Sequence, residues 1–193
     1  GTGGDFRKSI GLGAGFDEAL QCLRNGVVRP VDAGMLRFVD GDGRPVQRPF
    51  ANIASFGISG LVDHYVNTST KRLGGRVSFF IGSVRGLLAW KNVQMRVVVD
   101  GSTFHEGPTN LVTMANGRFF GGGMQMAPHA DLSDGLLDVV VFGDMSRATF
   151  AGMSRWIYSG NHLTRPLVKW TRGRVVEATV DGQALVDLDG EQP

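Results

Sequence analysis

Asp-Gly pairs recur along the whole sequence and constrain the fold more than any other feature. Six such pairs occur, and glycine makes up 29 of the 193 residues. Both residue types tolerate left-handed backbone, so each pair marks a tight turn between the short β-branched runs on either side. The pattern predicts a chain of short strands that reverses direction often.

Hydrophobic periodicity places the expected strands and helices. Strands are predicted at 31–39, 46–56, 93–99, 109–115, 136–142, 175–180 and 184–188. The turns at 40–43 and 181–182 predict two hairpins. Helices are predicted at 17–25, at 145–158, and within 60–91 as two helices or one interrupted helix. We expect a mainly β fold with helices (α+β), built as a two-layer antiparallel β-sandwich-like domain behind a short α/β remnant.

Composition excludes several functional classes. The chain has 20 basic and 18 acidic residues, a balance that does not indicate a nucleic-acid partner. Its single cysteine, Cys22, excludes an intrachain disulfide framework and a multi-cysteine metal site. The longest apolar stretch, 77–90, contains Arg85 and is shorter than the ~20 residues of a membrane-spanning helix.

The first residues form a glycine-rich stretch, Gly1-Thr2-Gly3-Gly4-Asp5. Residues without bulky side chains let backbone N–H groups approach phosphate oxygens, so this stretch is a candidate phosphate-binding loop. The alternative is a plain chain end. Because no initiator methionine precedes the loop, we expect the chain to be a fragment of a longer protein.

Two acidic segments are candidate functional sites. Asp189 and Glu191 would project to the same side of an extended backbone, and paired carboxylates suit a general base that removes a hydroxyl proton. A solvated turn is the alternative, which the local pattern alone favours. The loop at 131–136 offers carboxylates and carbonyl oxygens, which Mg²⁺ and Ca²⁺ prefer. The alternative there is an acidic surface loop.

Five motifs, taken in order, resemble the diacylglycerol kinase-like lipid kinases of bacteria, relatives of sphingosine kinases and more distantly of NAD kinases. They are Gly1-Thr2-Gly3-Gly4-Asp5-Phe6, Val31-Asp32-Ala33-Gly34, Gly121-Gly122-Gly123-Met124, Asp134-Gly135-Leu136-Leu137-Asp138 and Asp189-Gly190-Glu191. The resemblance implies that residues 1–28 are a remnant of an N-terminal nucleotide-binding domain. It also implies that residues 29–193 are the C-terminal β-sandwich-like lipid kinase domain.

The resemblance also implies catalytic roles. Gly1 and Thr2 correspond to nucleotide-contacting residues, and Asp5 and Asp32 to an acidic network around the catalytic Mg²⁺. Glu191 corresponds to the proton acceptor.

Three further roles and one departure follow from the same resemblance. Asp189 is a partner or rival of the proton acceptor. A structural Mg²⁺ would be held by the Asp134 carboxylate and by the backbone carbonyls of Asp131 and Leu136. Gly4 departs from the family pattern, which usually has Asn at this position.

The implied activity is ATP- and Mg²⁺-dependent transfer of the γ-phosphate to a lipid hydroxyl, with diacylglycerol converted to phosphatidic acid. The family's Gly-Gly-Asp-Gly-Thr signature is absent, so we expect the chain alone to be inactive. Two alternatives stay open: a kinase for a sphingoid base or another lipid, and a non-catalytic lipid- or membrane-binding β domain. The resemblance implies a cytoplasmic protein, peripheral at the inner membrane surface, and leaves a homodimer open.

Overall fold

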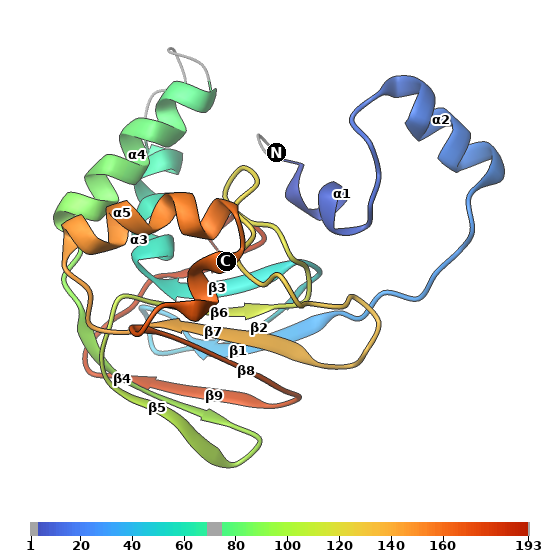
Figure 1. The fold of residues 1–193 in the computed structure, drawn as a ribbon. Coiled ribbons are helices and arrows are strands. Elements are labelled where there is room, and N and C mark those ends of the chain that lie inside the picture. Colours follow the sequence, from blue (N-terminus) through green and yellow to red (C-terminus); the bar gives the residue numbers. More distant parts are fainter. Residues whose placement is uncertain (1–3, 69–74, 193) are drawn as a thin grey trace.

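A computed structural model describes residues 4–68 and 75–192. Two antiparallel sheets stack on each other, and helices cover the free face of the larger sheet (Figure 1). This arrangement confirms the expected mainly β, two-layer fold. One buried cluster of side chains from both sheets and from the helices forms the core.

The larger sheet has five strands in the order β10-β3-β6-β7-β8. Its strands are β10 (Val186–Leu188), β3 (Ile53–Gly57), β6 (Leu111–Ala115), β7 (Leu137–Phe142) and β8 (Val168–Gly173). Every residue of β3 and β6 is buried, because the second sheet covers one face of these strands and the helices cover the other. Residues on both faces of this sheet therefore contribute to packing.

The smaller sheet has three strands in the order β5-β4-β9. They are β5 (Ser102–Thr109), β4 (Val93–Val99) and β9 (Val176–Val180). Met95, Val97 and Val99 of β4 are buried, whereas Gln94 and Arg96 are not, as the alternation in sequence predicts. The buried side chains face the larger sheet and join its core.

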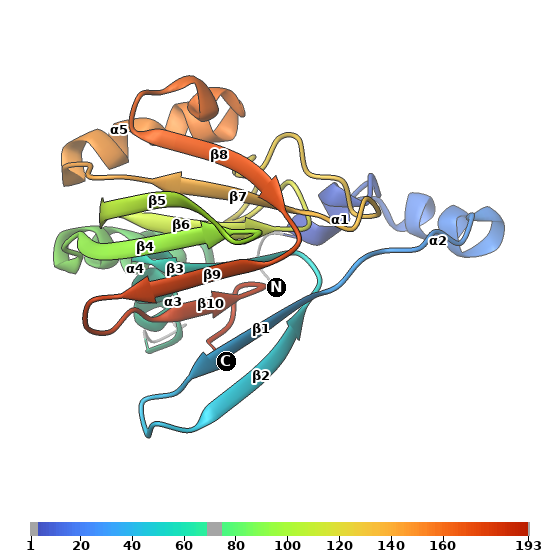
Figure 2. The ribbon, with the colours of Figure 1, turned by 90° about the horizontal axis from the view of Figure 1, so that it is seen from below.

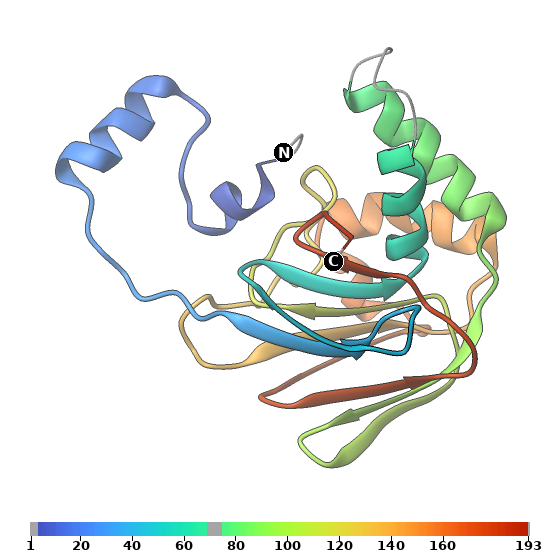
Figure 3. The same ribbon diagram turned by 180° about the vertical axis from the view of Figure 1, so that it is seen from behind.

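Three helices cover the face of the five-stranded sheet opposite the smaller sheet (Figure 3): α3 (Ile58–Thr68), α4 (Gly75–Ala89) and α5 (Arg147–Tyr158). The helices α3 and α4 are the two predicted within 60–91, and they pack closely. A Cβ atom at Gly82 or Gly86 would lie 2.5 Å from a valine methyl group of α3. Ser146 caps α5, because its hydroxyl accepts a hydrogen bond from the Thr149 amide. A short 3₁₀ helix, η2 (Asn161–Thr164), follows α5.

The N-terminal helices α1 (Asp5–Ser9) and α2 (Phe16–Asn25) lie to one side of the sheets (Figure 2). Phe16 and Leu23 of α2 are 80% and 84% exposed, so the apolar face of this helix is uncovered. An extended segment then leads to the two-stranded hairpin of β1 (Gly34–Val39) and β2 (Pro45–Phe50), which forms a separate small sheet.

The predicted strand 46–56 and the hairpin at 181–182 were wrong. The first is two strands of different sheets, since the amides of Ala51, Asn52 and Ile53 bind the Asp189 carboxylate between them. At the second, β9 pairs with β4 and β10 pairs with β3, so the turn leads from one layer to the other. Local periodicity does not specify which sheet a strand joins.

Candidate active site

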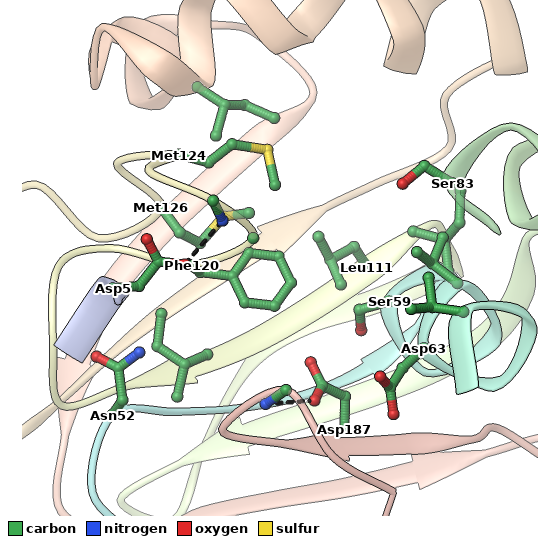
Figure 4. Close-up of a pocket in the computed structure, with 18 of the residues that line it drawn as sticks. Asp5, Asn52, Ser59, Asp63, Ser83, Leu111, Phe120, Met124, Met126 and Asp187 are labelled. Atoms are coloured by element: carbon green, nitrogen blue, oxygen red, sulfur yellow. Dashed lines mark hydrogen bonds between the residues drawn. The ribbon is translucent and has the colours of Figure 1, made fainter. Parts of the chain in front are cut away.

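A cavity of about 1070 Å³ lies between the five-stranded sheet, the covering helices and the glycine-rich loop at 117–124 (Figure 4). Most of its wall is apolar. Contributing side chains include Val62, Val84, Leu87, Leu111, Phe120 and Phe150. A long hydrocarbon chain fits a space of this size and character.

Asp5 attaches the N-terminal segment to one end of this cavity. Its Oδ2 accepts a hydrogen bond from the Gly122 amide at 2.7 Å, and its Oδ1 lies 3.3 Å from Lys8 Nζ. Gly121, Gly122 and Gly123 all have positive φ, which favours glycine, and this conformation presents the Gly122 amide to the carboxylate. Asp5 therefore lines the cavity from a fixed position.

Asp32 holds a different loop. Its Oδ2 accepts a hydrogen bond from the Gly135 amide at 2.7 Å, and its carbonyl accepts one from Asn116 Nδ2 at 2.6 Å. Across residues 4–68 and 75–192, no group of three or more His, Cys, Asp or Glu side chains is placed to hold a metal ion. The role of Asp5 and Asp32 around Mg²⁺ therefore stays a prediction.

The candidate Mg²⁺ loop at 131–136 forms two side-chain-stabilised turns. Asp131 Oδ1 accepts hydrogen bonds from the amide and the hydroxyl of Ser133, and these bonds lower the pKa of the Asp131 carboxyl. Asp134 Oδ1 accepts one from the Leu136 amide, and its Oδ2 lies 3.7 Å from Arg172 Nη1. The oxygen-rich donor set suits a hard cation, although the Arg172 guanidinium competes for the same carboxylate.

The Asp189-Gly190-Glu191 segment is a tight turn. Asp189 and Gly190 have φ of 53° and 90°, and Leu188 and Glu191 pair through backbone hydrogen bonds of 2.8 and 2.9 Å. The expected extended backbone was therefore wrong. The Asp189 carboxylate accepts hydrogen bonds from the amides of Ala51, Asn52 and Ile53 at 2.8–2.9 Å. Both of its oxygens are therefore occupied by backbone contacts that stabilise the fold.

Glu191 differs from its neighbour. It is exposed and lines the cavity. Within the part of the chain that the structure describes, its carboxylate has no hydrogen bond or ion pair. Of the two candidate bases, only Glu191 is free to meet a hydroxyl group in the cavity.

Asp187 is a cavity residue that the sequence did not reveal. It is 2% exposed, and its Oδ1 accepts a hydrogen bond from the Gly190 amide at 2.9 Å. Burial, together with the nearby Asp63 carboxylate of α3, raises the pKa of its carboxyl to about 7. The only sequence signal was an acidic residue between Val186 and Leu188 in a predicted strand.

Gly1 and Thr2, the predicted nucleotide-contacting residues, lie outside the described residues. The remaining predicted site residues fall into two groups. Asp5, Asp189 and Glu191 line the cavity, whereas Asp32 and the loop at 131–136 lie outside its lining.

Comparison with known proteins defines the class. Residues 52–193 match the family described as the YegS C-terminal NAD kinase beta sandwich-like domain, and the chain belongs to this family. Curated relatives that it matches include proteins named as diacylglycerol kinase and as probable lipid kinase, in agreement with the resemblance seen in the sequence.

Among these relatives, a "Diacylglycerol kinase" of Mycobacterium tuberculosis is 27% identical over 183 residues, covering 94% of this chain and 58% of the relative. A "Diacylglycerol kinase" of Bacillus subtilis is 26% identical over 193 residues, covering 99% and 60%. The chain thus spans about three fifths of the length of the relatives it matches.

Solved structures share the fold. A diacylglycerol kinase structure from Bacillus anthracis has a TM-score of 0.64 and 19% sequence identity, with 98% of this chain and 57% of that chain covered. At this identity the likeness supports the architecture alone.

Proposed function

We propose that the chain is the acceptor-binding part of an ATP- and Mg²⁺-dependent lipid kinase that phosphorylates diacylglycerol. The observation that carries the proposal is the free carboxylate of Glu191 at a large apolar cavity. The apolar wall suits acyl chains, and the accepting hydroxyl would lie against Glu191. There the carboxylate orients the hydroxyl and accepts its proton.

The turn that contains Glu191 is held from two sides. Asp189 binds three amides of the segment between β2 and β3, and Asp187 binds the Gly190 amide. A carboxylate held in a fixed position contributes to catalysis because proton transfer requires hydrogen-bonding distance to the substrate. Glu191 is thus the acceptor of the proton, and Asp189 a positioning residue.

Nucleotide and metal would bind at the N-terminal side of the cavity. We propose that residues 1–28 belong to the nucleotide-binding domain and residues 29–193 to the lipid kinase domain. Thr2 and Gly1 would contact the nucleotide, and Asp5 and Asp32 would bind waters of the Mg²⁺. When bound, Mg²⁺ neutralises charge on the phosphates. Asp131, Asp134 and Leu136 would hold a second, structural ion.

Contact with a membrane surface fits the outer face of α4. Ile81 and Leu88 of this helix are 36% and 62% exposed and lie outside the cavity lining, and no acidic residue occurs from 64 to 99. Exposed apolar side chains among basic residues bind anionic bilayer surfaces. No helix among the described residues is long and apolar enough to cross a membrane. We propose a cytoplasmic protein that takes its acceptor from the inner surface.

The proposal is tested by incubating the complete gene product with ATP, Mg²⁺ and a panel of lipids in detergent micelles. Phosphorylation of diacylglycerol that is lost in Glu191→Gln supports the proposal. Phosphorylation of no lipid, despite tight diacylglycerol binding, would instead favour a non-catalytic lipid-binding domain. A preference for a long-chain amino alcohol would identify a sphingoid kinase.

A further inference from the structure

Three polar side chains form a hydrogen-bonded row at one side of the apolar cavity. Asp187 of β10 is the direct cross-strand partner of Ser55 of β3. Ser55 Oγ lies 3.2 Å from Asp187 Oδ2 and 2.8 Å from Ser59 Oγ, in the first turn of α3. Ser59 and Asp187 line the cavity (Figure 4). Ser55 is fully buried and is not part of the cavity lining.

The protons carried by these side chains allow two arrangements in which both contacts of the row are hydrogen bonds. The Ser55 hydroxyl has one proton, so it can donate to Asp187 or to Ser59 but not to both. If Asp187 is ionised, Ser55 donates to it and Ser59 donates to Ser55. If Asp187 is protonated, it can donate to Ser55, and Ser55 to Ser59. The Ser59 proton is then available to a ligand in the cavity.

The surroundings of Asp187 shift its pKa so that both arrangements are populated near neutral pH. Burial, the Asp63 carboxylate of α3 and the Asp189 carboxylate of the turn raise its pKa to about 7, against the opposing hydrogen bonds from Gly190 and Ser55. A buried carboxyl that keeps its proton is a hydrogen-bond donor as well as an acceptor.

We propose that the Asp187–Ser55–Ser59 row is a subsite that donates a hydrogen bond from Ser59 to an ester carbonyl oxygen of an uncharged acylglycerol. The inference rests on the proposed function and specifies its acceptor. Acyl chains in this cavity bring their ester groups away from water, where an unpaired carbonyl is unfavourable. The row supplies a donor within a wall that is otherwise mostly apolar.

The test compares a diacylglycerol with its dialkyl ether analogue of the same chain length, which lacks the carbonyls. Dissociation constants for both are measured with the complete gene product in detergent micelles at about pH 6, where the Asp187 carboxyl is mostly protonated. We expect the ester to bind about 3- to 10-fold more tightly, the worth of one hydrogen bond. Ser59→Ala should remove this preference.

Ser154→Ala is the matched control. Ser154 also lines the cavity, but its hydroxyl donates to the Ala151 carbonyl of its own helix. This variant should keep the ester preference. Equal preferences in the wild type and in Ser59→Ala would overturn the inference.

A pH comparison separates the proposed role from a purely structural one, because neither glycerolipid titrates. The wild-type ester preference should fall between about pH 6 and about pH 8.5 as Asp187 ionises. Asp187→Asn should keep it at both values, since an amide can accept from Gly190 and donate to Ser55 permanently. A wild-type preference that does not change with pH would contradict the inference, as would tighter binding of a long-chain amino alcohol.

Binding and phosphorylation are measured separately so that the two proposals can fail separately. Ester preference without phosphorylation would remove the kinase proposal and keep the subsite. Phosphorylation with no ester preference would remove the subsite and keep the kinase.

Discussion

Asp189 and Glu191 are two residues apart, and their carboxylates have opposite environments. Asp189 accepts three backbone N–H groups, at 2.8, 2.9 and 2.8 Å, whereas Glu191 is exposed at the cavity without a partner in the described structure. The tight turn at Gly190 separates them. Asp189 therefore has a structural role, and the chemical role that we propose falls to Glu191.

Glu191→Gln should abolish most of the activity and leave the fold intact. Removing the proposed proton acceptor should lower turnover of the complete gene product by roughly 10²-fold or more. Turnover on diacylglycerol and the melting temperature are the two measurements. Near-normal turnover in this variant would exclude Glu191 as the acceptor of the proton.

Asp189→Asn should instead destabilise the fold. The carboxylate accepts with both oxygens, so the amide would place an NH₂ group against one of the backbone donors. We expect a loss of roughly 1–3 kcal/mol in the free energy of unfolding, measured by urea denaturation. Asp42→Asn, in an exposed hairpin turn, is the control and should change it by less than about 0.5 kcal/mol.

Asp187→Asn should stabilise the protein increasingly as pH rises from about 4 to 7. The carboxyl of Asp187 ionises near its ordinary pKa of 3.8 in the unfolded state and near 7 in the folded state, so the folded state binds the extra proton between these two pH values. The wild-type free energy of unfolding therefore falls over this range, by at most about 4 kcal/mol, and levels off above it. The difference between variant and wild type, measured by urea denaturation, should follow this course. A constant difference would show that the carboxyl titrates normally.

His162 should produce a pH dependence of opposite sign. Burial lowers the pKa of this histidine, whose Nε2 lies 3.0 Å from the Met126 carbonyl and whose ring stacks on Phe142. As pH falls below 6.5, the unfolded state gains a proton before the folded one, so stability is lost. His162→Gln should flatten this acid limb of the urea denaturation profile, whereas exposed His129→Gln should leave it unchanged.

Mg²⁺ should stabilise the protein through the loop at 131–136. At 100-fold excess over its dissociation constant, a bound ion adds about 2.7 kcal/mol to the free energy of unfolding. Asp134→Ala should abolish the Mg²⁺-dependent rise in melting temperature, and Glu191→Gln should retain it. Equal responses in Asp134→Ala and the wild type would show that the loop is only a turn held by Arg172.

The sequence by itself determined the family and many of the local elements, although no predicted strand covers β8 and only Thr109 of β5 was predicted. Alternation in 93–99 marked a half-buried strand, and the helices within 60–91 and at 145–158 followed from their periodicity. Both signals depend on neighbours a few residues apart, which the sequence shows directly. The order of the glycine and aspartate motifs was sufficient for the family, which the comparison confirms.

Only the tertiary structure decided which strands pair and which carboxylates are free. The 46–56 segment divides between two sheets because Asp189, 136 residues beyond Ile53, binds the amides at the break. Asp187 is buried against Ser55, 132 residues away, and this burial gives it an unusual pKa. Such contacts join residues far apart in the chain, and no local period encodes them. The chemistry of an acidic residue depends on its burial and hydrogen-bond partners, which exist only after the layers have packed.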